Sequence, residues 1–394
     1  MSEVIQSKID NGIRWIRESG IYNVEQSATE IYGGLNAYYD IERGAYPFVY
    51  TEITGYAISL FVQLYKYSGD EVFLNRAQSS ARWLIDIMRY SGEDENAKGS
   101  FAWAYDFTEG KQLKAYSFDC GVCTKAFLDL YEVTHDGHYL AQAKETLDWL
   151  TQVMQNEDGS LKASYNWSLK KSLSVPSIWY ENSGCLHAKM CIPLAFGSKA
   201  LNNPSLIKSV EALLHATFKL QRRDGGFKVN IFDNRVNLHA HCYALEGIIY
   251  LHNSLKERDD LLTSFIRGAE WLLSVEKDGK LPEWDTTRFL EAKLQTSYVA
   301  AQAIRIWLIS YKLTKDQRFL DGANRSLSYI LSMQCGTADN RTRGGFYEGY
   351  RIFDPLRFRI NRINTWATIF TIQALTMYQK FQTSEAAQLV YEII

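Results

Sequence analysis

Hydrophobic and polar positions repeat along the chain in one pattern, Tyr-x-x-Ser/Thr-x-Asp-x-x-aromatic-Leu-x-x-Ala, which occurs three times. The copies begin at Tyr65, Tyr131 and Tyr311, so the first two lie 66 residues apart and the last two 180 apart. The second spacing equals about three periods of roughly sixty residues, and a fixed period of this kind is typical of repeat architectures. The pattern therefore predicts an array of similar units that stack on one another.

Each copy of the pattern predicts the junction between two helices. The Tyr ends one helix, and Asp70, Asp136 and Asp316 cap the next by accepting hydrogen bonds from free backbone N–H groups. The aromatic-Leu-x-x-Ala stretch then supplies the apolar stripe of the second helix. The repeating unit is therefore a helical hairpin.

A second recurring element follows the second helix of several hairpins and contains glycine. It occurs as Asp158-Gly159, Asp224-Gly225-Gly226-Phe227, Asp278-Gly279 and Gly344-Gly345-Phe346. Glycine tolerates the positive φ that tight turns need, so these are turn signals. Each predicts a turn that leads through a short extended stretch into the next helix.

These signals divide the chain into thirteen expected helices. They span residues 4–18, 50–68, 71–90, 117–134, 138–155, 181–201, 204–220, 237–255, 259–275, 292–313, 316–334, 362–381 and 384–393. The helices that start near 50, 117, 181, 237, 292 and 362 are rich in Gly, Ala, Ser and Thr, so we assign them to an inner ring. The more charged alternating helices form the outer ring, and either the first or the last helix completes it.

Six inner and six outer helices predict an all-α fold, an (α/α)6 toroid that takes residues 1–394 into a single domain. An open solenoid is the alternative, but its end repeats would need polar caps, and the sequence has no such caps. A closed repeat also explains how 394 residues form one body, since ordinary domains are shorter.

Composition and charge narrow the functions that this fold can carry. The formal net charge is −2 and no basic block occurs, which excludes the electrostatic footprint of a nucleic-acid binder. No apolar run approaches the roughly 18 residues that span a membrane. The first eight residues are polar and the six cysteines are scattered, so we expect a cytoplasmic protein with reduced thiols. Aromatic residues make up 14% of the chain, and Tyr and Trp suit clefts that bind sugars.

The repeats resemble those of the six-hairpin toroid superfamilies. These include glycoside hydrolases and lyases, N-acylglucosamine 2-epimerases, glucuronyl C5-epimerases and the terpene cyclase/prenyltransferase group. The Gln-x-x-Asp-Gly-Gly-Phe turn at 221–227 is similar to the repeat of the last group. The segment Gly44–Tyr56 resembles a motif of helical-toroid proteins encoded with bacterial exopolysaccharide genes. The resemblance implies the toroid fold, with its active cleft at one end of the inner ring.

Polar residues recur at the starts of the inner helices, where such a cleft would lie. They are Glu52, Asp119, Glu181, His241, Gln295, Thr296 and Asn364. Asp, Asn and Thr at helix starts often do no more than cap the helix. Glu and His are weaker caps, so Glu52, Glu181, His239 and His241 favour a functional role.

The rim offers the groups that sugar chemistry requires. Hydrolysis needs two carboxyl groups that flank the bond, and Glu52, Asp119 and Glu181 are the candidates. Epimerisation or elimination at a uronate carbon needs a base, an acid and a cation. His239, His241, Tyr243 and Tyr56 are candidates for proton transfer, and the cation candidates are Arg235, Arg288, Arg357, Arg359 and Arg362. Aromatic candidates for substrate binding are Trp103, Tyr105, Trp179, Tyr180, Trp284, Tyr347 and Tyr350.

We therefore expect a carbohydrate-active enzyme in cell-surface polysaccharide metabolism that acts by acid/base chemistry on a glycan, uronate or amino sugar, without a cofactor. Epimerase, lyase and hydrolase remain open, and so does the oligomeric state. One alternative is a zinc-dependent enzyme similar to prenyltransferases and cyclases, with ligands among Cys120, Cys185, His187, His241 and Cys242. Cysteine also serves as a small packing residue in helices, and we favour this role for these cysteines over zinc binding. A glycan-binding protein without catalytic activity is the second alternative.

Overall fold

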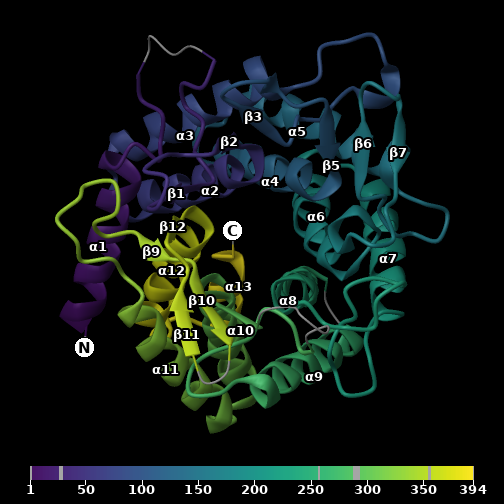
Figure 1. The fold of residues 1–394 in the computed structure, drawn as a ribbon. Helices are drawn as coiled ribbons and strands as arrows, with labels where there is room; N and C mark the ends of the chain where they lie inside the picture. Colours follow the sequence, from purple (N-terminus) through teal and green to yellow (C-terminus); the bar gives the residue numbers. More distant parts are fainter. Residues whose placement is uncertain (1, 26–29, 256–257, 287–292, 354–355, 394) are drawn as a thin grey trace.

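The computed structural model describes residues 2–25, 30–255, 258–286, 293–353 and 356–393. Its helices form two concentric rings, as Figure 1 shows. The inner ring consists of α2 (Thr51–Ser68), α4 (Ser117–Thr134), α6 (Cys191–Ala200), α8 (Leu238–Ser254), α10 (Ser297–Thr314) and α12 (Thr365–Lys380). The outer ring consists of α1 (Ser2–Glu18), α3 (Glu71–Trp83), α5 (Gly137–Trp149), α7 (Ser205–Phe218), α9 (Asp259–Val275) and α11 (Gln317–Ser332). Each inner helix packs against the next, and α12 packs against α2, so the ring is closed.

The first helix completes the outer ring. α1 packs on α12, and the indole of Trp15 donates a hydrogen bond to the backbone oxygen of Arg341, 2.8 Å away. The last helix, α13 (Ala386–Tyr391), packs against α8 and α10 instead. The predicted toroid is thus confirmed, and of the two helices proposed to complete it the structure selects the first.

The predicted helix caps are present in all three copies of the repeat. The side chains of Asp70, Asp136 and Asp316 accept hydrogen bonds from the backbone N–H two residues further on, at 2.9–3.0 Å. The caps belong to α3, α5 and α11, which are all outer helices. The repeat that the sequence shows is therefore the turn from an inner helix into the outer helix of the same hairpin.

The predicted glycine turns set the spacing between successive hairpins. Gly159 has φ +88°, and a Cβ there would lie 2.2 Å from the backbone oxygen of Ala212 in α7. Gly344 has φ +91°, and a Cβ there would lie 2.3 Å from the backbone oxygen of Asn11 in α1. The same close approach to an outer helix occurs at Gly33, Gly99, Gly225 and Gly279. One glycine per hairpin therefore lets each connecting loop lie directly on the next outer helix.

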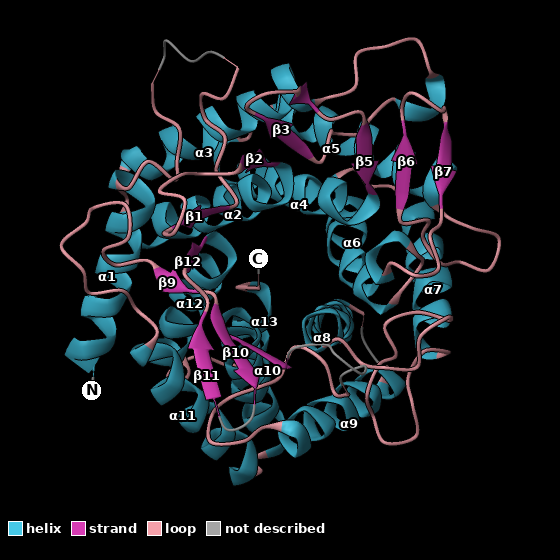
Figure 2. Ribbon diagram, viewed as in Figure 1, coloured by secondary structure: helices cyan, strands magenta, loops and turns pink. Residues whose placement is uncertain are grey.

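In the described residues, the extended stretches form four small antiparallel sheets, three strands in each, and Figure 2 shows these sheets at one end of the ring. One sheet joins β1 (Tyr38–Asp40), β12 (Arg362–Asn364) and β9 (Phe346–Tyr347), and another joins β11 (Leu356–Arg359), β10 (Gly349–Phe353) and β8 (Lys293–Thr296). The others join β2 (Phe48–Tyr50), β3 (Ala104–Asp106) and β4 (Gly110–Lys111), and β5 (Lys114–Tyr116), β6 (Ser164–Asn166) and β7 (Lys171–Leu173). The strands β2, β5, β8 and β12 each lead without a loop into an inner helix. This arrangement holds the first turns of those helices at one mouth of the ring.

Three helix predictions differ from the structure in their course. The expected helix over 181–201 is divided into the 3-10 helix η4 (Trp179–Glu181), the 3-10 helix η5 (Cys185–Met190) and α6. Gly184, between the two 3-10 helices, lies so close to the backbone of Val229 that the chain is extended there. The predicted helices over 71–90 and 138–155 end in π-helical turns, η1 (Leu84–Met88) and η3 (Leu150–Met154).

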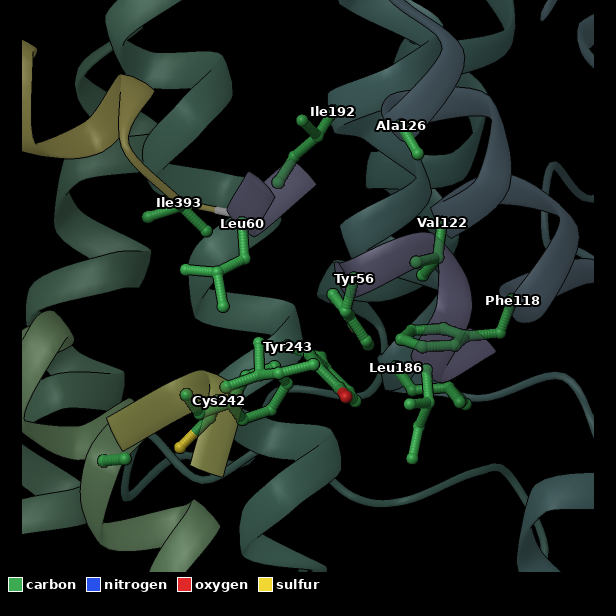
Figure 3. Packing of buried hydrophobic residues seen from close by; sticks show 14 of the residues in the cluster. Tyr56, Leu60, Phe118, Val122, Ala126, Leu186, Ile192, Cys242, Tyr243 and Ile393 are labelled. Carbon is green, nitrogen blue, oxygen red and sulfur yellow. The ribbon is translucent and has the colours of Figure 1, made fainter. Parts of the chain in front are cut away.

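Buried apolar side chains fill the space between the two rings and the centre of the inner ring. Figure 3 shows part of this packing, in which the rings of Tyr243 and Phe118 are inclined at 45° to each other with their centroids 4.6 Å apart. At the other end of the central space Ile393 packs near Leu60, so the C-terminal segment covers the mouth opposite the sheets. No helix in the described residues is long and apolar enough to cross a bilayer.

Candidate active site

A cavity of about 490 Å³ opens at the mouth of the ring where the sheets lie. Its floor is made by the first turns of the inner helices and its walls by the strands that precede them. It is lined by Tyr38, Phe48, Tyr50, Glu52, Trp103, Tyr116, Phe118, Asp119, Ala163, Trp179, Tyr180, Leu186, His187, His239, Tyr243, Tyr298, Glu348, Arg362, Asn364 and Trp366. The volume of this cavity is in the range of small-molecule binding sites. Its lining is also typical of such sites, because aromatic side chains surround a few ionisable groups. We call it the central cavity.

Two carboxyl groups lie on the floor of the central cavity, one on each of two neighbouring inner helices. Glu52 is in the first turn of α2 and accepts hydrogen bonds from the Trp366 indole at 3.1 Å and the Tyr243 hydroxyl at 3.3 Å. Asp119 is in the first turn of α4, and none of the described residues donates a hydrogen bond to its Oδ2. Both side chains are buried, at 6% and 3% exposure.

The two carboxyl groups have different surroundings, which affect the pKa of each. Burial raises the pKa of Glu52 to about 7, although the donated hydrogen bonds and nearby Lys189 act in the opposite direction. Burial, and then the negative charge of Glu52, raises the pKa of Asp119 well above its usual value. Both carboxyl groups therefore bind a proton more tightly than a carboxyl group in water does. Two hydrogen bonds stabilise the charged form of Glu52, whereas Oδ2 of Asp119 receives none from the described residues, so Glu52 is the better candidate for the base and Asp119 for the acid.

A buried ionic cluster lies directly beneath this floor. The carboxylate of Glu246 is fully buried and pairs with Lys189 at 2.8 Å and with Arg305 at 2.6 Å. Burial acts to raise the pKa of Glu246, but these two cations hold it below its usual value. Burial lowers the pKa of Lys189 to about 8, and its ammonium lies 4.7 Å from the ring centre of Tyr243. The cluster thus places a positive charge behind the residue that contacts Glu52.

The same cluster determines which nitrogen of His239 carries a proton. The Gln302 amide donates to Glu246 Oε1 at 3.4 Å, and its oxygen lies 2.6 Å from Nδ1 of His239. Because an ionised Glu246 only accepts, the amide nitrogen of Gln302 faces Glu246 and the amide oxygen faces the imidazole. Nδ1 of His239 is therefore the protonated nitrogen, and Nε2 keeps a free lone pair. Burial lowers the pKa of His239 to about 4, so the ring is neutral at physiological pH.

Ten residues singled out in the sequence line the central cavity together. They are Glu52, Asp119, His187, His239, Tyr243, Trp103, Trp179, Tyr180, Arg362 and Asn364. They come from the inner helices α2, α4 and α8 or from the segments that precede inner helices. The register of the repeat was therefore sufficient to predict many of the residues that line the cavity, although they lie far apart in the chain.

Other predicted catalytic residues lie outside the central cavity. His241 is fully buried, accepts from the backbone N–H of Phe227 at 3.2 Å and contacts the Gly268 oxygen at 3.1 Å, so it joins a turn to α9. Glu181 lies behind the cavity wall and binds Tyr116. Tyr56 is buried below the floor and stacks on Tyr243. A helix turns about 100° per residue, so the side chain of His241, two positions after His239, points away from that of His239 and from the cavity.

The remaining predicted binding residues lie on the rim or beside it. Tyr105 binds Glu30, while Arg235 pairs with Asp233 and stacks on Trp284. Gln295 pairs with Tyr350 across β8 and β10. The guanidinium of Arg359 lies over the ring of Tyr347, 4.0 Å from its centre. Of the arginines, only Arg362 lines the cavity among the described residues, and Arg288 lies outside those residues.

The residues of the zinc alternative are not brought together. In the part of the chain that the structure describes, no three His, Cys, Asp or Glu side chains form a group that could hold a metal ion. Cys120, Cys185 and Cys242 are all fully buried, and burial raises the pKa of each thiol. Cys120 accepts a hydrogen bond from the backbone N–H of Phe101. These cysteines therefore act as small packing residues of the inner helices.

Sequence reasoning missed several residues of the site. Among them are Tyr50, Tyr116, Tyr298, Glu348, Trp366 and the Lys189–Glu246–Arg305 cluster. A signal existed for the first two, because Tyr50 and Tyr116 both stand directly before the first residue of an inner helix. The cluster carried no local signal, since its members come from the interiors of different helices.

Comparison with known proteins identifies the architecture. No protein-family model matches the chain, and neither does any curated protein. A sugar epimerase from a ruminal bacterium superposes with a TM-score of 0.77 at 15% identity, covering 95% of this chain and 98% of that one. The cellobiose 2-epimerase of Bacillus thermoamylovorans gives 0.74 at 15% identity, covering 95% and 100%. The unsaturated glucuronyl hydrolase of Bacillus sp. GL1 gives 0.66 at 16% identity, covering 95% and 97%.

The chain therefore has the (α/α)6 toroid fold of these proteins over nearly its whole length. Because the identities are so low, the likeness establishes the fold, and the reaction has to be argued from the site itself.

Proposed function

We propose that the protein is a carbohydrate-active enzyme that performs acid/base chemistry on a sugar bound in the central cavity. The observation that carries this proposal is the pair of buried carboxyl groups on the cavity floor, of which Glu52 accepts two side-chain hydrogen bonds and Asp119 Oδ2 accepts none from the described residues. The named activities of the structural neighbours, which act on sugars, support it. The six cysteines are all free thiols, in keeping with an enzyme of the reducing cytoplasm.

Hydrolysis of a glycosidic bond is the reaction that the carboxyl pair fits best. Such hydrolysis uses one protonated carboxyl group to donate to the leaving oxygen and one carboxylate to activate water or to attack. Asp119 supplies the acid and Glu52 the carboxylate. The indoles of Trp103, Trp179 and Trp366 line the same cavity and offer flat apolar faces to a pyranose ring.

Epimerisation is the second candidate, and the neutral imidazoles favour it. His187 and His239 both line the cavity, and burial lowers the pKa of each to about 4. The lone pair on Nε2 of His239 could remove a proton from a sugar carbon next to a carbonyl group. Arg362 at the rim would pair with an anionic group on the substrate, as a uronate of a cell-surface polysaccharide would present.

Turnover of a glycan panel in heavy water, followed by mass spectrometry, tests the proposal. Cleavage with uptake of water identifies a hydrolase, and deuterium at a sugar carbon without cleavage identifies an epimerase. Cleavage without uptake of water, which leaves one of the two fragments unsaturated, identifies a lyase. No change in any glycan, together with tight glycan binding, would instead identify a binding protein.

The roles within the site are separated by three variants. We expect Asp119→Asn and Glu52→Gln to lower kcat by about 10²–10⁴-fold in a hydrolase, because each removes one proton-transfer group. His239→Gln should then have a much smaller effect on kcat. A reversed ranking, with His239→Gln as the most damaging change, would select epimerisation.

A further inference from the structure

A second cavity of about 380 Å³ lies beside the central cavity. It is lined by Asn156, Asp158, Ser160, Lys162, Ala163, Ser172, Leu173, Ser174, Glu181, Ser183, Gly184, Leu213, Ala216, Thr217, Lys219, Leu220, Ile231 and Phe232. These residues come from the loop before β6, from β7 and the segment that follows it through η4 to Gly184, from the C-terminal half of α7, and from the loop after α7. In Figure 2, β5, β6 and β7 lie side by side, with β7 farthest from the ring centre and nearest α7. The second cavity therefore extends outward from the central one along this sheet.

The wall between the two cavities is thin. Ala163 lines both of them. Glu181 lines the second cavity, and it accepts a hydrogen bond at 2.5 Å from the hydroxyl of Tyr116, which lines the central cavity. Glu181 also pairs with Lys114 and accepts from Ser164 at 3.0 Å. One layer of bonded side chains thus separates the two spaces, and a ligand that passes over it would touch both.

The lining of the second cavity is rich in hydroxyl and amide groups. Asn156 bridges Ser160 and Ser183, donating to their hydroxyl oxygens at 3.0 and 3.4 Å. A hydroxyl has one donor and two acceptor sites, so each serine keeps capacity for a ligand. Beside these groups Ile231 and Phe232 are 69% and 58% exposed. Polar groups that bind hydroxyls, next to exposed apolar surface, match the two kinds of surface of a sugar ring.

We infer that the second cavity binds a further sugar unit of an oligosaccharide whose reacting unit lies in the central cavity. The inference rests on the proposed function and extends it, since it makes the substrate a chain of at least two units instead of a free monosaccharide. Glu181, first considered for catalysis, then acts as a positioning residue. It holds Tyr116 on one side of the wall and closes the second cavity on the other.

A filling variant tests this inference. Ala216 lines the second cavity from α7, whereas its neighbour His215 is exposed and does not line the cavity. Ala216→Trp should fill the space, and His215→Trp is the matched control on the same helix. Phe232→Ala removes the exposed ring and serves as a second, milder variant. The probes are cello-, manno- and glucuronyl-oligosaccharides of one to four units. Their affinities are measured in a Glu52→Gln background, which slows hydrolysis during the measurement.

We expect at least one series to gain about tenfold or more in affinity from one unit to three, a difference that is easily measured. The gain should persist with His215→Trp, shrink with Phe232→Ala and vanish with Ala216→Trp, while affinity for a single unit stays unchanged. An equal gain with Ala216→Trp, or no gain with chain length, would overturn the inference. So would a failure of all the series to bind. Length-dependent binding without turnover by the unmodified protein would contradict the proposed reaction and leave the second cavity as a sugar site.

Discussion

Glu52 and Asp119 show what the sequence reveals about single residues and what it conceals. Both could be predicted from the repeat, because each stands in the first turn of an inner helix. Their difference could not be predicted. Glu52 receives its hydrogen bonds from Tyr243 and Trp366, which lie 191 and 314 residues further along the chain. The hydrogen-bond donors of Glu52 come from other inner helices, so they can be identified only from the closed ring in the structure.

The raised pKa of Glu52 makes the stability of the protein depend on pH. Its pKa is 4.5 in the unfolded chain and about 7 in the folded one, so the folded state binds its proton more tightly. The resulting stabilisation is complete below pH 4.5 and is lost as the pH rises through 7. We expect Glu52→Gln, measured by urea unfolding, to gain about 3 kcal/mol relative to the unmodified protein between pH 4.5 and 8.

The matched control for this measurement is Glu42→Gln, because Glu42 is exposed. The variant removes one carboxylate at a solvent-exposed position and so measures the general effect of a lost charge in the same titration. If the gain with Glu52→Gln were absent, Glu52 would have an ordinary proton affinity and the division into acid and base would fail.

The tautomer of His239 is also open to direct measurement. Nitrogen-15 NMR should show Nδ1 protonated and Nε2 unprotonated at pH 7, because Gln302 presents its amide oxygen to Nδ1. Gln302→Leu removes that acceptor and should shift the population toward the other tautomer without charging the ring. His215, which is exposed, provides an internal reference for an unconstrained imidazole. A spectrum with Nε2 protonated would contradict the assigned orientation of Gln302.

At the scale of elements, local signals predicted the helical hairpins well. The Asp caps and the glycine turns depend on backbone groups only a few residues away, so they can be recognised in the sequence. Contacts between hairpins are different. The break between η4 and α6 depends on the approach of Gly184 to Val229, 45 residues along the chain, and no local pattern predicted it.

The cap at the start of α5 provides a test at this scale. Asp136 accepts from the backbone N–H of His138 at 2.9 Å. We expect Asp136→Ala to lower the free energy of unfolding by about 1 kcal/mol, the usual cost of a lost N-cap. Asp136→Asn retains an acceptor and should cost much less in the same urea titration. Equal costs for the two variants would show that charge, and not the cap, is what matters there.

At the scale of the whole molecule, the closure of the ring is the feature that the sequence left undecided. Among the contacts that join the end of the ring to its beginning are three between α1 and residues 334–344. Gly344 lies on Asn11, Trp15 donates to the Arg341 oxygen, and the Gln334 amide donates to the Lys8 oxygen at 2.8 Å. The last contact joins residues that are 326 positions apart. Contacts between residues so far apart form only if the right number of hairpins closes the ring. The sequence of a single repeat does not specify that number.

Gly344→Ala tests this closure. The new Cβ would meet the Asn11 oxygen at 2.3 Å in a backbone conformation with φ +91°, so we expect a loss of about 3 kcal/mol in thermal or urea unfolding. Gly336→Ala is the control in the same connection, since a Cβ there meets nothing within 4 Å. A similar small effect for both variants would mean that α1 is not held tightly against this loop.

A closed ring has no terminal repeat, and this distinguishes it from an open array that frays from its ends. Every hairpin, including the one completed by α1, has a neighbour on both sides. A single cut in an exposed connection such as residues 91–93 would therefore leave each fragment held by the other at two interfaces. In gel filtration, the cut protein should still migrate as one particle. It should also retain its central cavity, because packing between hairpins holds the ring together even where the chain is broken.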